Sequence, residues 1–179
     1  QSYLAVHSDP AAGDPAEDSL IGVLTVQGGI VEFGPTGVDV ANAEVLIDQI
    51  RMAKEDEQIK ALVMRVDSPG GSAFASELIR EELSAFQASG KPVVASFGPV
   101  AASGGYWISA DADAIYAEPT TITGSIGIFG LVPNFSRSLD AIGINADGVS
   151  SAPLARGLSV VGDLSEQAKR ILQLSVEHG

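Results

Sequence analysis

The sequence predicts an α/β fold in which strand–helix units are stacked around a mainly parallel sheet. Short apolar runs typical of buried strands alternate with stretches of helical period, and glycine or proline separates them. Parallel strands need a crossover connection, usually a helix, and this alternation supplies one. The 179 residues, of which 45% are hydrophobic and 18% charged, are enough to bury a substantial core.

The first two strands are predicted at Leu20–Val26 and Ile59–Val66, both apolar and short. A helix between them is predicted from apolar residues at positions i, i+3, i+4 and i+7, namely Ala43, Leu46, Ile47 and Ile50. Residues 1–19 are rich in Asp, Ala, Gly and Pro and show no period. We expect them to be a flexible lead-in or linker before one domain that spans residues 20–179.

A second helix is predicted to begin after Ser72, a favourable N-cap, and to end at Gly90. Its apolar face is predicted to carry Phe74, Leu78, Ile79, Leu83 and Phe86. A third strand is predicted to begin at Pro92–Ser96.

The rest of the chain continues the pattern less regularly. A short helix is predicted near Ser103, a strand at Ala114–Ala117, a strand edge with turns over 120–131, and a helix over Phe135–Ile142. The last helix is predicted from a capping box, Asp163 to Glu166, followed by an apolar face of Leu164, Ala168, Ile171 and Leu172. Because the chain starts at Gln1 without a leader and stops in this helix, we expect a fragment of a longer protein.

Composition excludes several classes of function. The net charge of −13 disfavours binding to nucleic acid and to anionic lipid. Cysteine is absent, no residue cluster has metal-ligand spacing, and no phosphate-binding loop occurs, so neither a metal nor a cofactor is expected. No apolar run reaches the roughly 18–20 residues that span a bilayer.

A glycine-rich turn follows the second strand, at Asp67-Ser68-Pro69-Gly70-Gly71-Ser72. Two successive glycines let the backbone turn its N–H groups outward, and the N-terminus of the next helix adds positive potential. Such a turn can hold a developing oxyanion. A plain strand-to-helix turn would have the same composition.

The segment Ala101-Ala102-Ser103-Gly104-Gly105-Tyr106-Trp107 offers a candidate nucleophile. Small neighbours leave the Ser103 hydroxyl accessible, and the pattern resembles a nucleophile elbow with alanine in place of the first glycine. The amide of Gly104 would be a second oxyanion donor. The alternatives are that Ser103 is only an N-cap and that the two aromatic residues belong to the core.

A serine nucleophile needs a base, and the sequence offers no obvious one. His7 and His178 lie at the two ends of the chain, so a Ser-His-Asp triad is disfavoured. A buried lysine can also act as a base. The four lysines, Lys54, Lys60, Lys91 and Lys169, all have the sequence context of surface residues.

The two motifs, followed by Thr121-Ile122-Thr123-Gly124-Ser125-Ile126-Gly127, closely resemble the signal peptide peptidase A (protease IV) family. The resemblance runs from about Leu20 to the end and is closest to the C-terminal half of the long, tandem-domain form. It implies a Clp-protease/crotonase-like fold. It also implies that Ser103 is the nucleophile of a Ser/Lys dyad, that Gly70, Gly71 and Gly104 form the oxyanion hole, and that Ser125 positions the lysine.

One departure from the family pattern matters. In single-domain members the lysine follows the nucleophile in the same domain, but the corresponding stretch, Gly148–Arg156, contains none. Arg156 cannot replace it because a guanidinium stays protonated. In the long form the N-terminal half contributes the lysine, so we expect that half as a partner and expect the isolated chain to be nearly inactive.

The resemblance further implies residual signal peptides as substrates, a homo-oligomer, and a location at the bacterial inner membrane with the domain facing the periplasm. A membrane-bound Clp-class protease that trims stomatin-like partners is a related possibility. Two other classes remain open: a crotonase-type acyl-CoA enzyme, which would not need Ser103, and a non-catalytic half kept for assembly.

Overall fold

The computed structural model describes residues 4–7, 19–34, 39–128, 130–152, 154–155, 157, 159–162 and 164–178. Their elements, in chain order, are β1 Leu4–His7, β2 Leu20–Gln27, β3 Gly29–Val31, β4 Val40–Asn42, α1 Ala43–Glu55, β5 Ile59–Ser68, α2 Ala73–Ala88, β6 Val93–Ala102, α3 Gly104–Trp107, β7 Ala114–Tyr116, β8 Ile122–Gly124, α4 Ser136–Asp140 and α5 Glu166–His178.

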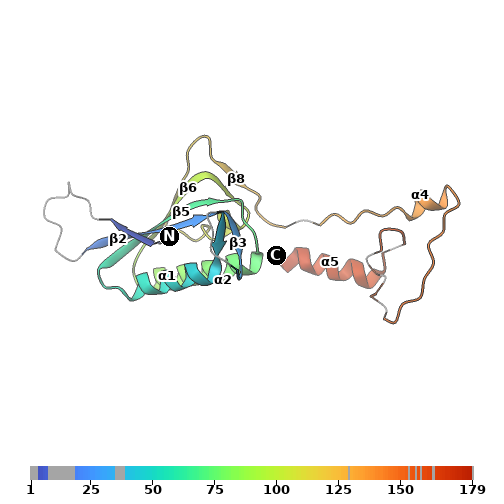
Figure 1. The fold of residues 1–179 in the computed structure, drawn as a ribbon, viewed down its shortest axis with the longest axis horizontal. Coiled ribbons are helices and arrows are strands. Elements are labelled where there is room, and N and C mark those ends of the chain that lie inside the picture. Colours follow the sequence, from blue (N-terminus) through green and yellow to red (C-terminus); the bar gives the residue numbers. More distant parts are fainter. Residues whose placement is uncertain are drawn as a thin grey trace. The chain divides into compact units, whose positions relative to one another are not determined.

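The main sheet has the strand order β1-β2-β5-β6-β7. β8 also pairs with β6 (Figure 1), at the end of that strand, whereas β7 pairs near its start. Every pairing except that of β1 with β2 is parallel. β3 and β4 form a second, two-stranded parallel sheet. The predicted α/β class with a mainly parallel sheet is therefore confirmed.

Residues 4–7 lie in the stretch that we expected to be a flexible lead-in. They form β1, which pairs antiparallel with β2 in a register that joins Leu4 to Leu24 and His7 to Ile21. The residue pattern of β1 is too short to stand out in the sequence. So short a strand forms because it pairs with the edge of an existing sheet. Residues 1–3 and 8–18 of that stretch lie outside the described residues.

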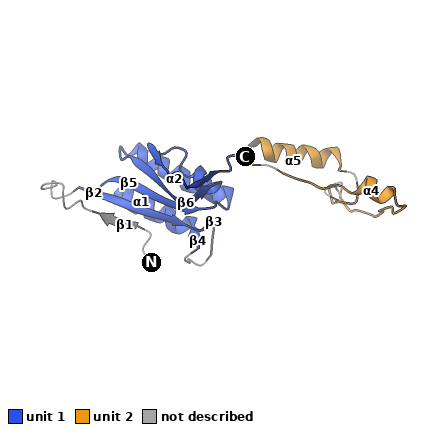
Figure 2. Cartoon of the chain, turned by 90° about the horizontal axis from the view of Figure 1, so that it is seen from above, with its two compact units in different colours: residues 1–126 blue, residues 127–179 orange. Residues whose placement is uncertain are grey.

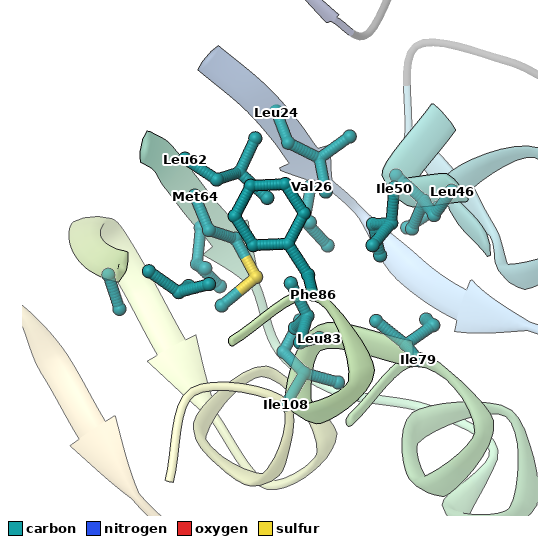
Figure 3. Packing of buried hydrophobic residues seen from close by; sticks show 14 of the residues in the cluster. Leu24, Val26, Leu46, Ile50, Leu62, Met64, Ile79, Leu83, Phe86 and Ile108 are labelled. Atoms are coloured by element: carbon teal, nitrogen blue, oxygen red, sulfur yellow. The ribbon is translucent and has the colours of Figure 1, made fainter. Parts of the chain in front are cut away.

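The core lies between the sheet and the two long helices, α1 and α2, which run side by side along one face (Figure 1). Phe86 of α2 is fully buried, and its ring lies among side chains from β2 and β5 (Figure 3). Alternate residues of β2, β5 and β6 point into this core, as in β5, where Leu62, Met64 and Val66 are all fully buried.

Both long helices start at side-chain caps. Asn42 accepts a hydrogen bond from the amide of Val45 at 3.3 Å, and Ser72, as predicted, accepts one from Ala75 at 3.2 Å. Caps of this kind satisfy amides that a helix cannot bond internally. The predicted apolar face of α2 is correct for Ile79, Leu83 and Phe86, which are buried. Leu78 is only half-buried, and Phe74 is 62% exposed because it lies on the outer side of the first turn, where Ala75 takes the buried place.

The chain divides into two compact units, Gln1–Ile126 and Gly127–Gly179 (Figure 2), where the sequence predicted one domain over residues 20–179. The second unit contains α4 and α5. α4 has no buried residue, so it contributes no face to a core.

The last helix has its N-cap two residues later than predicted, at Ser165 rather than Asp163. Ser165 accepts a hydrogen bond from the amide of Ala168 at 3.1 Å, and α5 starts at the next residue, Glu166. Asp163, the cap predicted from sequence, lies outside the described residues. Within the described part of the chain, no helix combines the length and the apolar composition that crossing a bilayer requires.

The core position of Phe86 gives a direct test of this packing. Phe86→Ala should lower the free energy of unfolding by about 3–5 kcal/mol, because it removes a fully buried ring and leaves a cavity. The matched control is Phe74→Ala, which should cost less than about 1 kcal/mol because that ring is mostly exposed. Urea denaturation of both variants measures the difference; equal losses would contradict the assignment of the core.

Candidate active site

Ser103 lies directly after the carboxyl end of β6, between that strand and α3. Its backbone has φ 51° and ψ −120°, a conformation that L-residues adopt rarely and that is found most often at functional sites. The residue occupies the N-cap position of α3, but its side chain makes no capping hydrogen bond. The alternative that Ser103 serves only as an N-cap therefore has no support in the geometry.

β8 fixes the position of Ser103 from one side. The backbone amide of Ser103 donates to the carbonyl of Gly124 at 2.9 Å, and the hydroxyl of Thr123 donates to the carbonyl of Ala101 at 2.6 Å. In the parallel register Ala102 pairs with Gly124, so Ser103 and Ser125 each follow a paired residue. Both serines have positive φ, 51° and 54°. The structure thus brings the two predicted serines to adjacent places at one end of the sheet.

The glycine-rich turn after β5 approaches Ser103 from the other side. A Cβ placed on Gly70 would lie 2.5 Å from the amide nitrogen of Gly104 and 2.8 Å from Cβ of Ser103. A Cβ placed on Gly104 would lie 3.2 Å from the amide nitrogen of Gly71. Backbones come this close only where side chains are absent, and this explains why both segments are glycine-rich. The three predicted oxyanion glycines therefore lie together with Ser103.

Only two of the three predicted oxyanion amides are free. The amide of Gly70 donates to Oγ of Ser68 at 3.1 Å, and the Ser68 hydroxyl in turn donates to the carbonyl of Gly28 at 2.7 Å. Among the described residues, the amides of Gly71 and Gly104 have no such acceptor. The expectation for Gly70 is corrected: its role is the close approach, and Gly71 and Gly104 offer the donors.

A charged network fastens α3 to α2. Nε1 of Trp107 donates to Oε2 of Glu77 at 2.7 Å, and Arg80 binds the same carboxylate through Nε at 2.8 Å and also contacts Asp111. The Arg80 hydrogen bond, followed by that of Trp107, lowers the pKa of Glu77 to about 2. Tyr106 packs its ring edge-on to Phe97, with 6.0 Å between centroids. Both aromatic residues are half-buried parts of this support. Tyr106 also packs against the core, as the interpretation of the two aromatics as core residues predicted for it.

Two lysines of the first unit, Lys60 and Lys91, lie at the opposite end of the strands from Ser103. Lys60 is the second residue of β5, and Lys91 precedes β6 and donates to the carbonyls of Ala53, Lys54 and Asp56 at the end of α1. Ser103 follows the tenth and last residue of β6, roughly 30 Å away at about 3.3 Å per residue. None of these lysines reaches Ser103.

The remaining titratable candidates add no base within the described part of the chain. Lys54 pairs with Glu82 at 2.7 Å, and Lys169, in the second unit, pairs with Glu166 at 2.7 Å. His7 ends β1 and His178 ends α5. Arg156 lies outside the described residues, and no group of three or more possible metal ligands occurs among those described.

Sequence reasoning missed the residues that support the site. Ser68 holds the glycine turn, Glu77 and Arg80 hold α3, and Thr123 holds β8. The sequence contains one signal for these residues: Ser68 lies in the glycine-rich turn 67–72, and Thr123 lies in the segment 121–127. Glu77 and Arg80 have the i, i+3 spacing of an ordinary ion pair on a helix surface, and Trp107, which donates to Glu77, comes from a different element.

An accessible serine beside two free backbone amides is the arrangement of a serine-type acyl-transfer site. Comparison with known proteins agrees with that class: the sequence profile of "Peptidase family S49" matches residues 85–179. "Protease 4" of Salmonella typhi is 49% identical over 180 residues, and "Protease 4" of Haemophilus influenzae is 47% identical over 159. The chain belongs to peptidase family S49, and the predicted family resemblance is confirmed.

The chain spans less than a third of the length of these two relatives. It covers 29% of the Salmonella protein and 26% of the Haemophilus protein, although 99% and 89% of the chain itself are matched. Among solved structures, Listeria monocytogenes ClpP1 has a TM-score of 0.41 at 18% identity, covering 50% of this chain and 46% of that one. The membrane-bound stomatin-specific protease 1510-N has a TM-score of 0.45 at 22% identity, covering 63% and 52%.

The contact between the two glycine segments can be tested by adding a methyl group. Gly70→Ala should be less stable than Gly124→Ala by about 1–3 kcal/mol in urea denaturation, the usual cost of overpacking. Both glycines have positive φ, 95° and 104°, so both variants carry backbone strain. Only the Gly70 variant meets other atoms, since nothing lies within 4 Å of a Cβ on Gly124. Equal stability would show that the turn is not packed on Gly104.

The network around Trp107 predicts a pH dependence of stability. The pKa of Glu77 falls from 4.5 to about 2 on folding, so its charge stabilises the fold above pH 4.5, and this contribution is lost as the pH falls towards 2. Glu77→Gln lacks that charge, so wild type should exceed the variant in stability at neutral pH and converge with it near pH 2. The fluorescence of Trp107, the only tryptophan, reports unfolding. A stability difference independent of pH would contradict this account.

Proposed function

We propose that the chain is the nucleophile-bearing domain of a serine endopeptidase that uses a Ser/Lys dyad. The observation that carries the proposal is the strained Ser103 with the free amides of Gly71 and Gly104 beside it. Membership of peptidase family S49 supports a peptidase over other acyl-transfer enzymes.

In the proposed reaction, Oγ of Ser103 attacks the carbonyl carbon of the scissile peptide bond while a neutral lysine takes the hydroxyl proton. The amides of Gly71 and Gly104 donate to the oxygen that becomes negative in the tetrahedral intermediate. The intermediate collapses, the leaving amine takes the proton from the lysine, and Ser103 is left as an ester. Water, activated by the same lysine, then releases the acid and restores the serine.

The lysine is proposed to come from outside this chain. Lys60 and Lys91 lie at the far edge of the sheet, and the side chain of Lys54 pairs with Glu82. The two Protease 4 relatives are more than three times as long as the chain, so they have ample sequence for a second domain that carries a base. Ser125, adjacent to Ser103 across the β6–β8 pairing, would orient the incoming ammonium group through its hydroxyl.

The proposed substrate is an extended peptide with small or apolar side chains. Its main chain would add as a strand beside Gly71. One relative, 31% identical over 161 residues, is named "Putative signal peptide peptidase SppA" in Enterococcus faecium. On that basis residual signal peptides at the bacterial inner membrane are the proposed natural substrates, with this domain in the periplasm and the site completed in an oligomer.

Hydrolysis of a fluorogenic apolar peptide tests the proposal. The chain alone should be nearly inactive, and activity should appear when it is mixed with the lysine-bearing N-terminal half of the full-length protein. Ser103→Ala should abolish that activity, by 10³-fold or more as an order of magnitude, because the covalent step is lost. Ser175→Ala, an exposed helix position, is the matched control and should leave the rate unchanged.

Three outcomes would overturn the proposal. Activity of the chain alone would mean that one of its own lysines is the base. Activity that survives Ser103→Ala would favour a crotonase-type acyl-CoA enzyme, which uses carboxylates as acid and base. Failure of a serine-directed acylating probe to label Ser103 in the full-length protein would favour a non-catalytic assembly half.

A further inference from the structure

A groove of about 440 Å³ lies on the outer side of α1 and α2, away from the sheet. Its apolar lining includes Ile47 of α1, Leu78 and Phe74 of α2, and Phe33, which follows β3. The two phenylalanine rings are 62% and 76% exposed. Large aromatic rings left this open beside a groove are typical of a surface that binds a partner.

The rim of the groove is strongly acidic. Five carboxylates line it, from Glu32, Glu44, Asp48, Glu81 and Glu82, against a single cation, Arg51. Arg51 is already bound by Glu82 at 2.8 Å and lies 3.9 Å from Asp48. Glu44 and Glu81 are exposed and have no ion-pair partner among the described residues. The unneutralised charge therefore lies on Glu44, in the first turn of α1, and on Glu81, in the middle of α2.

The end of the groove that Glu32 lines is joined to the glycine turn of the candidate active site. The hydroxyl of Ser72 donates to Oε1 of Glu32 at 2.8 Å, and the amide of Ser72 donates to the carbonyl of Ile30 at 2.9 Å. From Ala43 to Arg51 the groove follows α1 for eight residues, or about 12 Å at 1.5 Å per residue. The groove therefore begins close to the turn that contains Gly71, since Ser72 is the next residue of that turn.

We propose that the groove binds a cationic amphipathic peptide segment, in which lysine or arginine residues are interspersed with large apolar ones. The apolar side chains would pack on Phe33 and Phe74, and the cations would pair with Glu44, Asp48 and Glu81. The binding of such a segment to the groove does not depend on the proposed function. The further statement that the segment belongs to the peptide being cleaved does rest on the proposed function, and it places the basic part a few residues from the scissile bond.

Charge decides between this occupant and a second copy of the chain. The groove has a net charge of −4 from its side chains and the whole chain has −13, so two copies repel each other. A cationic segment is attracted over the same surface, and its attraction weakens as salt is added.

The test is binding of a fluorescein-labelled 14-residue peptide of Lys, Leu and Ala, measured by fluorescence anisotropy on the Ser103→Ala chain, which cannot cleave it. Glu44→Gln/Glu81→Gln should weaken binding about fivefold, from two partly exposed ion pairs, and should reduce its salt dependence. Phe74→Ala should also weaken it. The matched control is Glu55→Gln/Glu57→Gln, which changes the net charge equally at the far end of α1 and should shift binding less than twofold.

Three results would overturn the proposal: no saturable binding, equal weakening by both double variants, or equal affinity for a peptide with Glu in place of Lys. A dimer of the chain in sedimentation that dissociates in Phe74→Asp would also overturn it, since a second copy would then cover the groove. None of these readouts depends on catalysis. Loss of peptide hydrolysis with intact binding would therefore count against the proposed function and not against the groove.

Discussion

The close backbone contact between Gly70 and Gly104 is the constraint on which the site depends. A side chain at either position would push the two segments apart, since a Cβ on Gly70 would lie 2.5 Å from the Gly104 nitrogen. The contact sets the free amides of Gly71 and Gly104 beside Ser103. The amide of Gly70 donates to the hydroxyl of Ser68 and so holds the turn in place, whereas the amide of Gly71 remains free. Catalytic donors that are fixed in advance need no reorganisation when charge develops.

The parallel sheet places these groups together at the carboxyl ends of its strands. β5 ends at the glycine turn, β6 ends at Ser103, and β8 ends just before Ser125, and the carboxyl ends of parallel strands meet at the same side. The helices that follow β5 and β6 are then tied together by Glu77 and Trp107. The same topology sends Lys60 and Lys91 to the amino edge, where Lys91 closes the end of α1. Ser103 and the two free amides are thereby gathered at one end of the strands, and these two lysines lie at the other.

The outer face of the helices carries different chemistry from the sheet edge. The core side of α2 is made of Ile79, Leu83 and Phe86, all buried, whereas Phe74 and Glu81 face outward beside α1. One helix therefore supports the site through Ser72 at its N-terminus and lines an acidic apolar groove along its length. The groove adjoins the glycine turn through Glu32, which accepts a hydrogen bond from the hydroxyl of Ser72.

Local sequence determined the fold class, the long helices with the Ser72 cap, and the candidate Ser103, because apolar period and turn chemistry are properties of neighbouring residues. The motifs also located Gly71, Gly104 and, by resemblance, Ser125. Only the tertiary structure decided which amides are free, that Phe74 faces outward, that Leu4–His7 joins the sheet, and that Trp107 binds Glu77. These facts depend on contacts between residues far apart in the chain, and no local pattern encodes them.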